Sequence, residues 1–485
     1  MASSRPATSG GLPESPTPKT ASVNHSLDAP SLREKSSAID PENPALIDRR
    51  AERSAAWKVD LLVVPLVGMY YLLSFLDRSN IGNARLAGLQ QSLNMSNHQF
   101  STALTITYVP YIVMELPMNL VMKRFGANIT LPLMVTLWGM VCACQGAVKT
   151  YGGLLACRFF LGALEGGLFP GIVLYMSSFF KRHALQLRFS MMFSVTSLAG
   201  AFSGLLAAAI ENMDGIRGLP GWAWIFILEG LFTTVFGLVS VFIIPAEPRD
   251  IKYLTPEERE AYTRALAEDW SGDADADGKA QEVFSWSEVA SVFTDAPHVL
   301  LLGLPLFFSG VTLYGLANFT PTIVNALGFS PTRSQLLSVP PYACSFVFSI
   351  VASYFSDRYG QRGIMAVACS LLAAAGYAIF IGTANTHANY AGLFLQIVGV
   401  YSVTPCLSTW NANNVQPHYR RATAVAFAFV CTNLGGIVST WIFIGPPRFH
   451  VASSINLAFA LAMAVLCAGT MGFLRRGNAR KRREV

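Results

Sequence analysis

Ionisable side chains lie inside or beside long apolar stretches in the N-terminal half of the sequence. They are Asp77, Arg78, Glu115, Arg158, Glu165 and Glu229. A charged group inside a bilayer costs roughly 3 kcal/mol, so it is rarely accidental. A guanidinium binds a carboxylate through two hydrogen bonds, and a carboxyl buried away from water can take up and release a proton. These residue types predict a site for an organic anion and for protons.

The spacing of Arg158 and Glu165 places them on nearly the same face of one helix, about 10 Å apart along its axis. That separation is too long for a direct ion pair on a straight helix. A substrate carboxylate or charges from another helix could lie between them, and Asp77 with Arg78 are the obvious partners. We therefore expect both residues to be functional; the alternative is a purely structural buried pair.

Small residues follow Arg158 on the same stretch. Glycines at 162, 166, 167 and 171 form small-xxx-small pairs, which allow a neighbouring helix to approach closely. Pro170 is expected to bend the helix at this point.

The remaining candidates are weaker. For Glu115 and Glu229, a packing or gating salt bridge is favoured over contact with a substrate. Polar and aromatic groups of the C-terminal half would contact the body of the substrate, unless they serve only for packing. These are Tyr314, Asn318, Trp410, Asn413, Asn414 and Asn433, with Tyr70 and Tyr108 from the N-terminal half.

The composition is that of an integral membrane protein. Of the 485 residues, 52% are hydrophobic and 13% are charged, whereas soluble globular proteins carry roughly 25% charged residues. Apolar blocks of about 20 residues recur, which is the length that spans a bilayer. They predict an all-α membrane protein with twelve transmembrane helices, at 59–83, 100–122, 128–148, 153–180, 188–210, 222–244, 298–326, 337–356, 363–382, 389–410, 420–444 and 453–474.

A long polar stretch divides these helices into two groups of six. Its segment YLTPEERE, at 253–260, predicts a short amphipathic helix with Thr255 as cap and Pro256 in the first position. The expected organisation is a disordered cytosolic arm at 1–56, a six-helix half at 57–244, a cytosolic loop at 245–297, a second six-helix half at 298–474, and a basic tail at 475–485.

Lys and Arg concentrate in the N-terminal arm, in alternate loops and in the tail. The positive-inside rule therefore places both termini in the cytoplasm, in agreement with an even number of helices. The tail could instead bind nucleic acid or acidic lipid, but topology is the simpler interpretation. We expect the plasma membrane and no nucleic-acid partner.

Reactive groups give no sign of an enzyme. The eight cysteines show neither the spacing of a disulfide framework nor that of a metal site. Because no nucleophile–base set or nucleotide-binding loop is present either, no enzyme activity, metal or cofactor is expected. Asn94 begins the sequon N-M-S in a predicted outer loop, where glycosylation and chance occurrence are both open.

Two loops occupy the same place in each half. NLVMKRFGAN at 119–128 and SYFSDRYGQR at 353–362 share an Arg, an aromatic residue and a Gly. With two six-helix halves, this loop resembles that of the major facilitator superfamily, whose motif is Gly-x-x-x-Asp-Arg-x-Gly-Arg-Arg/Lys. The second copy matches at Asp357, Arg358, Gly360 and Arg362, whereas the first has Asn119 and Lys123 at two motif positions and keeps Arg124.

Such a loop would act as a charge latch between helix ends at the cytoplasmic face. A plain basic loop explains Lys123 and Arg124 equally well. The expected gating residues are Arg124, Asp357, Arg358, Arg362 and Glu115.

Further motifs narrow the resemblance. LDRSNIGNA, ELPMN, RFFLGALEGGLFPG, WAWIFILEG, LTPEER and NLGGI, spread from about residue 57 to 475, are similar to the anion:cation symporter branch. Within it they most resemble the fungal allantoate permease group, which includes nicotinate and pantothenate transporters. The resemblance implies that Asp77, Arg78 and Arg158 serve anion binding and proton coupling, and that Glu165 is protonated.

The expected protein is thus a pseudo-symmetric, monomeric transporter with the major facilitator fold. It would import a small carboxylate with protons by alternating access. Efflux of a small metabolite or drug-like compound and a non-transporting nutrient sensor are the alternatives.

Overall fold

The computed structural model describes residues 44–271, 286–415, 418–443 and 449–484. The chain divides into two units, Met1–Ile47 and Asp48–Val485, and the second contains the candidate membrane spans of the described residues. Twelve helices in the described part are long and apolar enough to cross a membrane, as predicted.

The N-terminal half runs from α1 to α8, with short 3-10 turns after α7. Its helices are α1 (Pro44–Leu86), α2 (Leu89–Ser92), α3 (Asn97–Phe125), α4 (Ala127–Gln145), α5 (Tyr151–Glu165), α6 (Leu168–Phe179), α7 (Arg182–Ile210) and α8 (Gly221–Ile243), and the turns are η2 (Glu211–Met213) and η3 (Ile216–Gly218).

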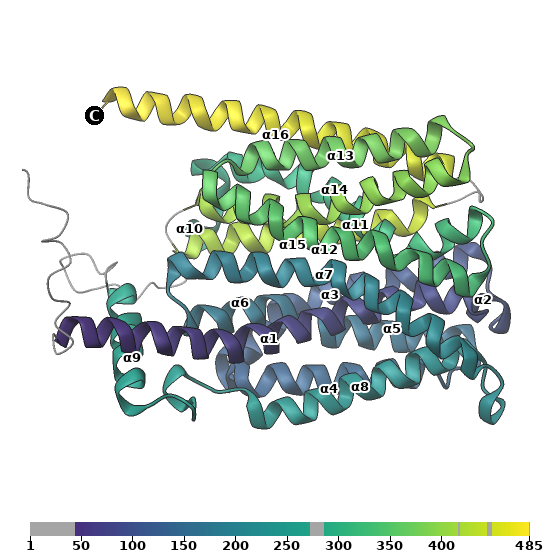
Figure 1. Ribbon diagram of the computed structural model, residues 1–485, viewed down its shortest axis with the longest axis horizontal. Coiled ribbons are helices and arrows are strands. Elements are labelled where there is room, and N and C mark those ends of the chain that lie inside the picture. The colour runs from purple at the N-terminus through teal and green to yellow at the C-terminus, as the bar shows by residue number, and fades with distance from the viewer. Residues whose placement is uncertain (1–43, 272–285, 416–417, 444–448, 485) are drawn as a thin grey trace, which may run out of the picture. The chain divides into compact units, whose positions relative to one another are not determined.

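The central loop and the C-terminal half follow. The loop contains η4 (Pro248–Asp250), α9 (Pro256–Ser271) and α10 (Trp286–Asp295), and the second half contains α11 (His298–Ala326), α12 (Pro331–Tyr359), α13 (Arg362–Gly382), α14 (Thr386–Asn413), α15 (His418–Ile442) and α16 (His450–Glu484). In Figure 1 the described end of α16 and α9 lie at one end of the helices, and α2 lies at the other.

The two halves repeat the same helix pairings. In the first half α3 packs on α5 and α4 on α8; in the second, α12 packs on α14 and α13 on α16. Between the halves, α7 contacts α12 and α3 contacts α15. In each half, the second membrane span packs on the fourth and the third packs on the sixth. This repeat is the pseudo-symmetry that the repeated loops predicted.

Helix α1 begins earlier than the sequence suggested. The described residues before 57 are helical, so the disordered arm expected at 1–56 does not extend to its predicted boundary. Ion pairs hold this part of α1 to neighbouring helices: Glu52 pairs with Lys181, directly before α7, and Asp48 pairs with Arg264 of α9 at 3.0 Å. The sequence predicted a disordered arm here because the stretch lacks an apolar core, whereas this part of the helix is held by polar contacts.

Helix α9 has the predicted start and cap. The Glu258 N–H donates to the Thr255 Oγ1 (3.2 Å), and the Thr255 N–H donates to the Glu258 Oε2 (2.9 Å), which forms a capping box. Lys58 and Ser54 also donate to the carboxylate. Hydrogen bonds from Lys58, Ser54 and Thr255 hold the pKa of Glu258 at about 2.

Glycines bring α5 against α3. A Cβ at Gly162 would overlap the carbonyl oxygen of Thr107, and one at Gly166 would overlap that of Tyr111. The predicted close approach is therefore confirmed. The break in this span falls directly after Glu165, at Gly166 and Gly167, and not at the predicted bend at Pro170. Pro170 has no N–H to donate to the Gly166 carbonyl, so the helical hydrogen bond between these two residues cannot form.

Substitution of Gly162 by Val should destabilise the protein by about 3 kcal/mol, because the side chain must displace the α3 backbone. Thermal unfolding of the purified protein in detergent measures this. The matched control is Gly152→Val on the same helix, where a Cβ would meet nothing within 4 Å. Equal melting temperatures for the two variants would contradict this account of the packing.

Glu258→Gln should weaken the attachment of α9 to α1 by about 1 kcal/mol at pH 7. The pKa of Glu258 is lowered on folding from 4.5 to about 2, so this stabilisation is present above pH 4.5 and is lost as the pH falls through about 2. Hydrogen-exchange protection of the α9 amides measures it, with the exposed neighbour Glu257→Gln as control. The hypothesis fails if the α9 amides are protected from exchange in Glu258→Gln as well as they are in Glu257→Gln and in the parent protein.

Candidate functional site

Asp77 and Arg78 are adjacent but point to different helices, because successive residues are about 100° apart around a helix. The Trp138 Nε1–H donates to Asp77 Oδ2 (2.9 Å), and the Cys142 thiol donates to Oδ1 (3.2 Å). Trp138 and Cys142 are four residues apart on α4, so they share one face. Asp77 is therefore fixed inside the N-terminal half by two neutral donors.

Arg78 forms a buried ion pair with Glu165. Its Nε and Nη2 lie 3.0 and 2.9 Å from Glu165 Oε1, and the side chains are 9% and 1% exposed. The Ser74 hydroxyl donates to the same oxygen. The Tyr111 ring lies 4.5 Å from the guanidinium, at a cation–π distance. The sequence predicted Asp77 and Arg78 as partners of Arg158 and Glu165 without assigning the pairs, and the structure pairs Arg78 with Glu165.

Arg78 also reaches the C-terminal half. Its Nη1 donates to the Tyr314 hydroxyl of α11 (3.1 Å), which donates to Asn433 Oδ1 of α15 (3.0 Å). The Tyr108 ring of α3 packs edge-on against Tyr314, with centroids 5.3 Å apart. These contacts join the buried ion pair of one half to the polar groups predicted in the other.

Arg158 lies deeper in the N-terminal half and is only 2% exposed. Its Nε and Nη2 have no hydrogen-bond partner among the described residues. The guanidinium lies 5.6 Å from the ring centroid of Phe226 on α8. Nε and Nη2 form one edge of the guanidinium, the same edge that Glu165 occupies on Arg78, and its geometry suits a carboxylate. Arg158 thus has a buried edge that no described residue occupies and that has the geometry to bind a carboxylate.

The two remaining carboxyls do not form the salt bridges predicted for them within the described part of the chain. Glu229 is 4% exposed and neither carboxyl oxygen has a hydrogen-bond partner there. Glu115 is half-buried, one turn from Tyr111, and its Oε2 likewise has no partner among those residues.

A central cavity lies between the halves beside Arg78. Its volume is about 20 Å³, enough for about one water molecule. Aromatic rings dominate the lining, and Tyr314 brings its hydroxyl to it. The lining residues are Tyr71, Phe75, Phe193, Thr196, Leu313, Tyr314, Tyr401, Thr404, Pro405, Ser408, Phe429 and Thr432.

Contacts between the halves lie on both sides of this cavity. Towards α2, the hydroxyls of Thr105 and Thr440 are 2.8 Å apart, and the Trp441 Nε1–H donates to Thr105. Towards α9, the rings of Phe169 and Phe429 stack with centroids 3.6 Å apart. The cavity must therefore enlarge before it can hold an organic molecule.

Three predicted substrate contacts do not line this cavity. Trp410 packs against Gly363 and Met471, and Asn413 and Asn414 are exposed at the end of α14. Helix α14 passes the cavity earlier, at 401–408, so the sequence placed the polar contacts too far along it.

Asn318 is buried elsewhere, on α11. Its carbonyl oxygen lies where a Cβ of Gly82 on α1 would be, so it forms a close contact between the halves. Tyr70 is also buried, and its ring packs edge-on against Phe236 of α8. Neither residue lines the central cavity.

The predicted latch is formed only in part among the described side chains. The Arg362 Nη1 donates to the Thr409 carbonyl (3.1 Å), which ties α13 to α14. Arg124 and Arg358 are exposed at the ends of α3 and α12. The side chain of Asp357 lies outside the described part. The gating role of these residues stays a prediction.

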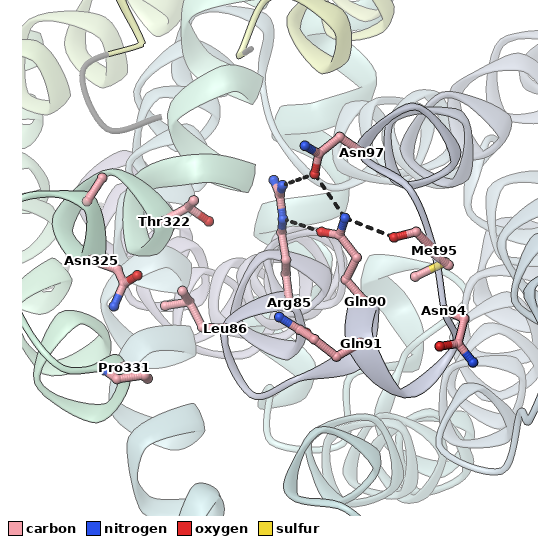
Figure 2. A pocket seen from close by; sticks show the side chains of 11 residues that line it. Arg85, Leu86, Gln90, Gln91, Asn94, Met95, Asn97, Thr322, Asn325 and Pro331 are labelled. Atoms are coloured by element: carbon pink, nitrogen blue, oxygen red, sulfur yellow. Dashed lines mark hydrogen bonds between the residues drawn. The ribbon is translucent and has the colours of Figure 1, made fainter. Parts of the chain in front are cut away.

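A second cavity, of about 800 Å³, opens where α1 and α11 end and where α3 and α12 begin (Figure 2). Arg85 donates to the side-chain oxygens of Gln90 and Asn97, each at 3.0 Å. Asn94, the predicted glycosylation site, lies at its edge with a left-handed backbone (φ 50°) and an exposed side chain. Its modification stays a prediction.

Sequence reasoning missed several partners of the buried charges. Ser74 lies one turn before Arg78, which is a usable signal. Trp138 and Cys142 look like ordinary packing residues of an apolar helix, and no local pattern marks them as partners of Asp77.

Comparison with known proteins agrees with this geometry. The model of the Major Facilitator Superfamily matches residues 67–440. An uncharacterised transporter of Schizosaccharomyces pombe is 34% identical over 451 residues, covering 93% of this chain and 89% of the relative. The high-affinity nicotinic acid transporter of Saccharomyces cerevisiae is 30% identical over 433 residues, covering 89% and 79%.

Solved structures show the same fold. The partially occluded, inward-open xylose transporter XylE of E. coli has a TM-score of 0.66 at 12% identity, covering 84% of this chain and 97% of that one. A bacterial homologue of the human lysosomal transporter Spinster has a TM-score of 0.62 at 15% identity, covering 86% and 96%. This protein is a membrane transporter, not an enzyme, and it belongs to the major facilitator superfamily, in the group of fungal transporters that includes a nicotinic acid transporter.

Proposed function

We propose that this transporter carries a small organic carboxylate together with protons, by alternating access of the two halves. The observation that carries the proposal is the buried Arg78–Glu165 pair, which abuts the central cavity through Tyr314. A guanidinium at this place can exchange a protein carboxylate for a substrate carboxylate, since both occupy the same edge.

The proton acts on Glu165. Protonation removes its negative charge and weakens its hold on Arg78, which is then free to bind the substrate anion. Loss of the proton on the other side restores the pair and displaces the anion. Asp77 is a second buried carboxyl of the N-terminal half, and neutral donors bind both of its oxygens. We assign Asp77 a supporting role in proton coupling.

The cavity lining suits a substrate with a flat, apolar body. The rings of Phe75, Phe193 and Phe429 face the cavity beside Tyr314, and such rings stack on other aromatic rings. Nicotinic acid, the compound in the name of the yeast relative, is an aromatic monocarboxylic acid. An aromatic monocarboxylate is therefore the first class to test.

The free energy supplied by the coupled protons limits how far the substrate can accumulate. One proton per monoanion is electroneutral and supplies about 1.4 kcal/mol, or about tenfold accumulation, for each pH unit. A second proton would add about 2.3 kcal/mol for each 100 mV of membrane potential.

We further propose a functional monomer in the plasma membrane with both termini in the cytoplasm. The described end of α16 and helix α9 lie at the same end of the helices (Figure 1), where the chain is richest in Lys and Arg. The 800 Å³ cavity beside α2 would then face outward.

Uptake of labelled aromatic monocarboxylates by vesicles that contain the purified protein tests the function. An inward pH gradient should drive accumulation of about tenfold for each pH unit and proton. Glu165→Gln should bind the anion but lose this dependence on pH. The control is Glu260→Gln, an exposed substitution on α9. Full pH-driven accumulation by Glu165→Gln would refute the assigned coupling role.

Arg158→Lys should lower kcat/KM for anion uptake by about tenfold to a hundredfold, because an ammonium cannot supply two parallel hydrogen bonds. Arg249→Lys, at an exposed position, is the matched control. Uptake kinetics of the two variants decide the point, and normal uptake by Arg158→Lys would remove Arg158 from the binding site.

A further inference from the structure

Glu229 is a buried carboxyl that the exchange between Arg78 and Glu165 does not use. It lies on the first half of α8, is 4% exposed, and has no hydrogen-bond partner for either oxygen among the described residues. An ionised carboxylate without a partner is costly inside a membrane protein, so burial favours the protonated acid.

Its surroundings contain one cation and one further acid. On α1, Asp77 and Asn80 lie close to the Glu229 carboxyl, and on α4 the thiol of Cys142 is near. On α5, Arg158 contacts the ring of Phe226, one turn before Glu229. Helix α7 has no ionisable residue between Arg188 and Glu211. Glu211, in η2, and Asp214, directly after it, precede α8 in the chain, and Asp214 accepts a hydrogen bond from the N–H of Gly221, the first residue of α8.

Charge balance follows from these groups. Arg78 and Glu165 neutralise each other, which leaves Arg158 with Asp77 and Glu229. One cation balances one carboxylate, and two acids close together do not both ionise readily. Asp77 accepts hydrogen bonds at both oxygens, which stabilise its charge, whereas no described residue donates to Glu229 with hydrogen-bond geometry, although the Asn80 side chain lies beside it.

We propose that Glu229 is a second proton-binding site of this transporter, and that the open Nε–Nη2 edge of Arg158 receives its carboxylate when the proton leaves. The proposal rests on the proton-coupled function above and adds one proton to it. The proton binds Glu229 in the conformation described here, and it leaves when α5 and α8 shift within the N-terminal half so that the Glu229 carboxylate meets Arg158. No covalent bond changes.

The first experiment compares pH-driven accumulation with exchange. Glu229→Gln imitates the protonated acid, so exchange of labelled for unlabelled aromatic monocarboxylate at equal pH should stay within about twofold of the parent protein. Accumulation should fall by about tenfold for each unit of pH gradient, because one coupled proton is lost. Glu229→Asp keeps a carboxyl and should restore accumulation, and Glu260→Gln is the surface control.

The second experiment measures the proton itself. The infrared spectrum of the purified protein in lipid at pH 7 should show a carboxylic-acid carbonyl band that is missing in Glu229→Gln and present in Glu260→Gln. This reading does not depend on transport or on the choice of substrate.

The outcomes separate the two proposals. If the parent protein shows no pH-driven uptake of any monocarboxylate, the proposed function fails, and the second proton site fails with it. If the parent protein accumulates the anion and Glu229→Gln does so equally well, only the second site fails. An unchanged infrared band in Glu229→Gln overturns the second site whatever the transport result.

Discussion

A charge that is buried in a membrane-spanning bundle needs an opposite charge or hydrogen bonds, and the Arg78–Glu165 pair meets this need beside the central cavity. The surrounding packing depends on it. Gly162 and Gly166 let α5 lie directly against α3, which brings Tyr111 under the guanidinium. The helix then breaks directly after Glu165, so the carboxyl stands at the end of a rigid segment and faces α1.

The two buried arginines differ in their surroundings although both lie in the same half. Arg78 has a carboxylate partner and a hydroxyl from the other half, and that hydroxyl belongs to Tyr314, which lines the cavity. Arg158 has an aromatic ring and an open edge, and it lies away from the cavity lining. In the proposed function, the first exchanges its partner with the substrate. The second has an edge without a partner among the described residues, in the geometry that a carboxylate binds.

Much of the fold could be predicted from sequence, because span length and the repeat of polar loops are local properties of the chain. The position of Asp77, Arg78, Arg158 and Glu165 in apolar segments predicted that these charges would serve one another, but not which of them would pair. The partners of Asp77 could not be predicted, because they depend on the rotation of α1 against α4. The place where α14 passes the cavity could not be predicted either: Trp410 and Asn413 lie outside the lining, whereas Tyr314 is part of it.

The hydrogen bond from Arg78 to Tyr314 joins an ion pair to the contact between the halves, and this has a consequence for leakage. Suppose that Glu165 carried its proton across without an anion. Arg78 would then cross with its charge uncompensated, and movement of the halves would also strain its bond to Tyr314. The empty carrier with Glu165 ionised, or the carrier with both proton and anion, avoids this cost. The geometry thus disfavours the passage of a proton without the anion. Tight coupling then depends on Arg78 and on its two partners, Glu165 and Tyr314.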